Sequence, residues 1–145
     1  MKKSLFLVLA VVLMGLLILP SCSGGGSSGG GTPDPPPAPA EANLAVTLSP
    51  ANGSVQPPAL PPFPLTVTIT STMPPSGVRI EITAKKDDGS GAAAYFSTNV
   101  TSTAATNNFT ITGTPVGVQC LVEVKVTSLT KATNVWTGSY RYTSK

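Results

Sequence analysis

The sequence contains no histidine, and charged residues make up only 10% of its 145 residues. Histidine is the most frequent general base and metal ligand in proteins, so its absence removes the usual starting point for catalytic and metal sites. Aspartate and glutamate are also few, with six in the chain. We find no Ser-His-Asp set, metal-ligand cluster or phosphate-binding loop, and we therefore expect no enzyme, no metal and no bound cofactor.

The chain also lacks a basic region suited to nucleic acid. Its formal net charge is +3, and two of its nine basic residues are Lys2 and Lys3, which lie in a segment expected to be removed. The remaining chain then has a net charge of 7 − 6 = +1. Nucleic-acid binding would require basic residues clustered on one surface, so we expect no such partner.

No apolar run is long enough for a typical membrane-spanning helix. The run from Leu5 to Leu19 follows Met-Lys-Lys and falls short of the ~18 residues expected of a spanning segment. It ends in Leu19-Pro20-Ser21-Cys22, which resembles a bacterial lipobox. The resemblance implies a signal peptide over residues 1–21 and a Cys22 that carries covalent lipid. The alternatives are a short transmembrane anchor and ordinary cleavage after Ser23.

The next segment has the composition of a tether. Residues 23–31 are only Gly and Ser, and residues 32–42 are rich in Pro and Ala. We expect a disordered linker over residues 22–42, flexible at first and then favouring polyproline II. A Pro-rich docking motif is the alternative. No Asp follows Cys22 directly, so the lipoprotein resemblance implies the outer membrane in a cell with two membranes, with acyl chains providing the membrane contact.

Residues 43–145 predict seven short strands separated by turns. Each strand alternates apolar and polar residues, and the region from 92 to 105 predicts only one weak edge strand. Residues 57–64 predict a proline-dense loop, and Asp87 to Gly91 predict a hairpin turn. The predicted strands lie within residues 44–48, 65–70, 78–85, 92–105, 109–112, 118–127 and 136–142.

This rhythm is similar to that of bacterial immunoglobulin-like and fibronectin type III-like domains, and the segment Leu48-Ser49-Pro50-Ala51-Asn52-Gly53 resembles their first strand and turn. The resemblance implies an all-β, seven-stranded, immunoglobulin-like β-sandwich over residues 43–145. The antibody-type Cys, Trp, Cys arrangement is absent. Cys120 shares its side of a strand with four valines, so a buried free thiol is expected.

Five charged residues form the predicted interaction face, because immunoglobulin-like order places their strands side by side. They are Arg79, Glu81, Glu123, Lys125 and Arg141. Simple ion pairing on a solvated face is the alternative.

Two further groups of residues leave alternatives open. Trp136, Tyr140 and Tyr142 share one side of the last strand and are either core residues or an exposed platform for sugars. Asp87 and Asp88 suit a hairpin tip better than a calcium site, which needs more oxygen ligands.

We therefore expect a lipid-anchored bacterial envelope protein whose β-sandwich is a non-enzymatic interaction, adhesion or accessory module for an unknown protein or glycan. One alternative is a structural component that self-associates through an edge strand. The other is an enzyme with an unrecognised site.

Overall fold

The computed structural model describes residues 40–145, which are all-β. The predicted signal peptide, the predicted lipidation site Cys22 and most of the predicted linker lie outside the described residues. Within residues 40–145, no helix is long and apolar enough to cross a membrane.

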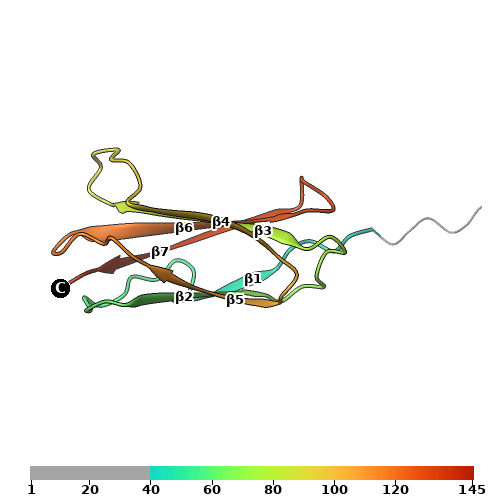
Figure 1. Cartoon of the computed structure of the whole chain (residues 1–145), viewed down its shortest axis with the longest axis horizontal. Helices are drawn as coiled ribbons and strands as arrows, with labels where there is room; N and C mark the ends of the chain where they lie inside the picture. The colour runs from blue at the N-terminus through green and yellow to red at the C-terminus, as the bar shows by residue number, and fades with distance from the viewer. Residues whose placement is uncertain (1–39) are drawn as a thin grey trace, which may run out of the picture. The chain divides into compact units, whose positions relative to one another are not determined.

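Seven strands form two antiparallel sheets, as the alternating pattern predicts (Figure 1). One sheet has the order β1-β2-β5, and the other has the order β4-β3-β6-β7. The bounds are β1 Val46–Ser49, β2 Phe63–Ile69, β3 Val78–Lys86, β4 Phe96–Ser102, β5 Thr106–Ile111, β6 Gln119–Ser128 and β7 Val135–Thr143.

The hydrophobic core lies between the two sheets and is built from the inward side of each strand. Residues that alternate in the sequence alternate in burial, so that β3 buries every second side chain from Val78 to Ala84. Each fully buried Val, Leu or Ile contributes about 1.5–3 kcal/mol relative to an exposed one. The residues with no exposed surface include Leu65, Val67, Val78, Ile80, Ile82, Ala84, Cys120, Val122 and Val126.

Two strands begin two or more residues before their predicted bounds. β2 begins at Phe63 and includes Pro64, whereas the sequence predicts that Pro64 lies in the loop. Pro64 pairs with Thr110 of β5 on one side of β2. On the other side, β1 does not extend as far as Pro64, so no sheet hydrogen bond is needed there. β5 begins at Thr106, before the predicted apolar alternation, because pairing with β2 orders a polar stretch that has no pattern of its own.

The connection between β3 and β4 is also longer than the predicted hairpin turn. It runs from Asp87 to Tyr95 and projects away from the sandwich (Figure 1). Gly89 and Gly91 adopt positive φ angles of 73° and 67°, which glycine reaches without steric cost. The turn residues were therefore identified correctly, but the strand resumes later than expected.

The outer edge of β7 is covered by the chain between β1 and β2. This covering segment, residues 53–59, runs parallel to β7 and forms bridges from Val55 to Arg141 and from Ala59 to Ser144. Its backbone bonds include Gly53 N to Ser139 O at 2.7 Å and Gln56 N to Arg141 O at 2.8 Å. The four-stranded sheet is thus protected at one edge.

Candidate functional site

The outer face of the four-stranded sheet gathers half of the charged side chains of residues 40–145. Because side chains alternate along a strand, the residues between the buried ones on β3, β6 and β7 all point to this side. We call this surface the charged face. It carries Arg79, Glu81 and Lys85 from β3, Glu123 and Lys125 from β6, and Arg141 from β7.

The strand order brings four of the predicted residues together. β3 pairs with β6 so that Glu81 lies directly opposite Lys125, and their charged atoms are 3.4 Å apart. Arg79 approaches the same carboxylate oxygen of Glu81 at 3.6 Å. That oxygen is shielded from solvent and accepts no hydrogen bond, so its interactions are the two ion pairs with Arg79 and Lys125.

A second ion pair lies beside the first. Lys85 Nζ is 2.8 Å from Glu123 Oε2, and both side chains are substantially exposed. Sequence reasoning left Lys85 out of the face although it shares the parity of Arg79 and Glu81. Exposed pairs of this kind contribute about 0–1 kcal/mol each, so they fix the arrangement of charges more than the stability of the domain.

Arg141 lies on the same face but has a different partner. Its Nε donates to Asp87 Oδ2 at 2.5 Å, and the backbone N–H of Asp87 donates to Gln119 O at 2.9 Å. The sequence suggested that Asp87 is a hairpin tip. The structure instead places its carboxylate where it ties the loop after β3 to β7. Arg141 therefore marks one end of the charged face.

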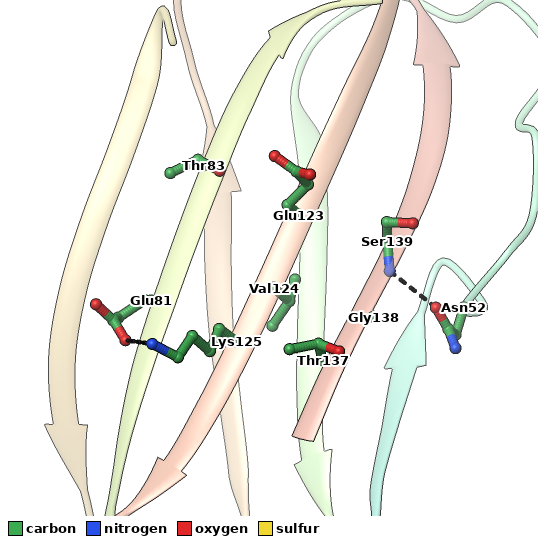
Figure 2. A pocket seen from close by; sticks show the side chains of 9 residues that line it. All are labelled: Asn52, Glu81, Thr83, Glu123, Val124, Lys125, Thr137, Gly138 and Ser139. Atoms are coloured by element: carbon green, nitrogen blue, oxygen red, sulfur yellow. Dashed lines mark hydrogen bonds and ion pairs between the residues drawn. The ribbon is translucent and has the colours of Figure 1, made fainter. Parts of the chain in front are cut away.

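A groove of about 580 Å³ crosses the charged face (Figure 2). Figure 2 shows Glu81 and Lys125 pointing toward one another on neighbouring strands, with Asn52 beside β7. Asn52 comes from the β1–β2 connection, and its Oδ1 accepts from the backbone N–H of Ser139 at 2.8 Å. The groove is lined by Asn52, Glu81, Thr83, Glu123, Val124, Lys125, Thr137, Gly138 and Ser139.

The lining offers hydroxyl, amide, carboxylate and ammonium groups on a rigid sheet. Such a surface donates and accepts hydrogen bonds and presents both charge signs, which favours specific recognition of a polar partner. Four of these residues, Asn52, Thr83, Thr137 and Ser139, were missed from the sequence. The alternation of side chains along the strands indicates that Thr83, Thr137 and Ser139 lie on the charged face. No local sequence pattern indicates that Asn52 lies there. Within residues 40–145, no group of three or more Cys, Asp or Glu side chains comes together to hold a metal ion.

The aromatic residues of β7 face the opposite side of the sheet. Tyr140 and Tyr142 are buried at 2% and 3% exposure, and Trp136 is partly buried against the core. The ring of Tyr142 packs 4.5 Å from that of Phe63, measured between centroids. These tyrosines are core residues rather than an exposed platform.

A small hydrogen-bond network ends at the Tyr142 hydroxyl. It lies 2.9 Å from the Tyr95 hydroxyl and 2.7 Å from Thr114 Oγ1. Burial raises the pKa of Tyr95, Tyr140 and Tyr142 above the ordinary value for tyrosine. Burial therefore disfavours the ionised form of all three phenols.

Cys120 is buried and free, as its parity with the valines predicts. Its Sγ lies 3.5 Å from Val118 O. It contributes packing to the core at a position that solvent does not reach.

In comparisons with known proteins, no family model matches this chain, and no curated protein or solved structure matches it with significance.

Proposed function

We propose that this chain is a lipid-anchored protein of a bacterial envelope, tethered through Cys22, whose β-sandwich binds a polar partner without catalysing a reaction. The partner is a protein segment or a glycan with hydrogen-bonding groups and charges. The single observation that carries the binding role is the groove on the charged face, with its ordered pattern of opposite charges. The lipobox resemblance and the Gly, Ser and Pro composition of the tether support the anchor.

The proposal includes an immunoglobulin-like domain. Supporting this, the third, sixth and seventh strands are neighbours in one sheet, while the first, second and fifth form the other. In the constant-type immunoglobulin domain the fourth strand belongs with the first, second and fifth, whereas β4 here pairs with β3. The proposed relationship is therefore to the wider group of such sandwiches.

Two features of the face favour binding over a purely stabilising role. The ion pairs are substantially exposed and therefore contribute little to folding. The groove between them is walled by groups with unused hydrogen-bonding capacity, including the hydroxyls of Thr83 and Thr137. A mixed-charge surface of this kind gives salt-dependent encounter and partner discrimination more than high affinity.

The test compares the wild-type chain with Glu81→Gln/Glu123→Gln on a glycan array and against envelope proteins recovered by cross-linking. Neutral amides are preferable to lysines, because Glu81→Lys would place like charges directly opposite each other at Lys125. We expect the double variant to keep its melting temperature within a few degrees and to lose salt-sensitive binding. Thr47→Gln, exposed on the other sheet, is the matched control. Binding of the identified partner that survives the double variant would contradict the proposal.

A further inference from the structure

The two sheets have four outer strands, and the chain protects them unequally. A free edge presents unpaired backbone groups that another strand can join. β7 is covered by residues 53–59, and β1 has only four residues and is followed directly by Pro50. β4 and β5 have no comparable protection.

β4 is the more complete free edge. It has seven residues, Phe96–Ser102, and pairs along one side with β3. It contains neither a charged residue nor a proline, the usual means by which edge strands resist pairing. Val100 lies in its middle, opposite Ile80 on the core-facing side, and is 37% exposed. An apolar side chain is thus left partly open to water at this edge.

The chain segment around β4 is uncharged as well. No charged residue occurs between Gly89 and Val122, a stretch that contains both β4 and β5. The residues 103–105 connect these strands, so β5 borders the other sheet on the same side of the sandwich. Neither strand therefore carries a charge of its own that would repel an identical strand, and the nearest charges beside β4 are Arg79 and Glu81 on β3, which are of opposite sign.

We propose that β4 is the site at which two copies of this chain pair, strand against strand and antiparallel, across a two-fold axis. The pairing joins two four-stranded sheets into one and covers Val100. β4 aligned with itself meets only Ser, Thr, Asn, Val and Phe side chains, whose cross-strand pairs are favourable or neutral. The covered edge of β7 prevents the same sheet from adding further copies, so the joined sheet ends after two copies of the chain.

The membrane anchor of the proposed function favours formation of this contact, and in this respect the inference rests on the proposed function. Copies confined to a membrane surface have a high effective concentration, so a weak edge contact is enough to populate the pair. Antiparallel pairing within one continuous sheet also places both charged faces on the same side. The pair then presents two grooves on one side to a partner that has repeated binding sites.

The experiment is thiol cross-linking of the full chain in cells. Ser97→Cys and Asn99→Cys are placed on the exposed side of β4, and Thr47→Cys on β1 is the matched control. The wild-type chain reports the background from Cys22 and Cys120. After oxidation, we expect a β4 variant to give several-fold more disulfide-linked dimer than Thr47→Cys on a non-reducing gel.

A second change tests the edge itself. Val100→Lys, added to the cysteine that cross-links best, should reduce the dimer to the control level, because a charge at this position opposes pairing. Since a lysine at partly buried Val100 can destabilise the domain, Thr101→Lys on the exposed side is a second variant. Equal cross-linking by β4 and control cysteines, or a dimer unaffected by both lysines, would overturn the proposal. Dimer formed by the wild-type chain through Cys22 would instead count against its lipidation.

Discussion

The indole ring of Trp136 lies over Gly138, two residues further along β7. A β-carbon at Gly138 would overlap the indole and would lie 2.8 Å from Oδ1 of Asn52. Because glycine has no side chain, the indole of Trp136 and the side-chain amide of Asn52 can both approach the backbone of Gly138. These contacts connect the core to Asn52, the residue that directly precedes the segment covering the edge of β7.

Gly138→Ala should lower the free energy of unfolding by about 1–3 kcal/mol, because the added methyl group cannot fit without moving Trp136 or Asn52. Trp136 is the only tryptophan in the chain, so its fluorescence reports the displacement directly. Urea unfolding followed by this fluorescence measures both effects. Thr137→Ser, on the opposite side of the strand, is the control. Unchanged stability and emission in Gly138→Ala would show that the packing is looser than described.

We expect removal of the hydroxyl group to affect the stability of the domain differently at Tyr140 and at Tyr142. The Tyr140 hydroxyl is buried and has no hydrogen-bond partner, whereas that of Tyr142 contacts Tyr95 and Thr114. Tyr140→Phe should leave stability unchanged or raise it, because a buried unsatisfied group is removed. Tyr142→Phe should cost about 1–2 kcal/mol, because two hydrogen bonds are lost. Thermal unfolding of the pair tests this, and equal losses would contradict it.

Alkaline pH should destabilise the domain through its tyrosines. All three have pKa values raised in the folded state, mainly by burial. The folded state then holds protons that the unfolded state releases near pH 10, so this stability is present below pH ~10 and is lost as the pH rises above it. Each tyrosine contributes a slope of at most ~1.4 kcal/mol per pH unit.

Melting temperatures between pH 8 and 12 measure this loss, and tyrosinate absorbance should appear together with loss of the β-type circular dichroism. Tyr140→Phe serves as the control and should show a shallower decline. Tyrosinate absorbance that develops near pH 10 in a protein still folded would show that the phenols are accessible to solvent.

Cys22→Ser should abolish acyl labelling and signal cleavage at this site, since the thiol is the expected point of lipid attachment. Labelling with a fatty-acid analogue, together with membrane fractionation, measures both. Cys120→Ser is the matched control and should be labelled and cleaved as the wild type is. A Cys22→Ser chain that is processed identically and still partitions with membranes would disprove the lipobox assignment.

The strands whose residues alternate between apolar and polar could be predicted from the sequence. The strands composed mainly of polar residues were harder to predict. The segments 78–85 and 118–127 each show which side is buried, and the structure places that side in the core from Val78 to Ala84 and from Cys120 to Val126. β5 was recognised only from Phe109 onward, because Thr106, Asn107 and Asn108 carry no apolar signal. Their strand conformation depends on pairing with β2, which a local pattern does not report.

The sequence by itself determined the class of fold, the inward side of most strands and the burial of Cys120, because alternation and turn residues act over a few neighbouring positions. Only the tertiary structure decided which strands lie together and which edges are covered. Asn52 reaches Ser139, 87 residues away, because the chain after β1 runs along β7. The groove and the free edge at β4 both follow from this strand order, since contacts between distant segments depend on the path of the whole chain.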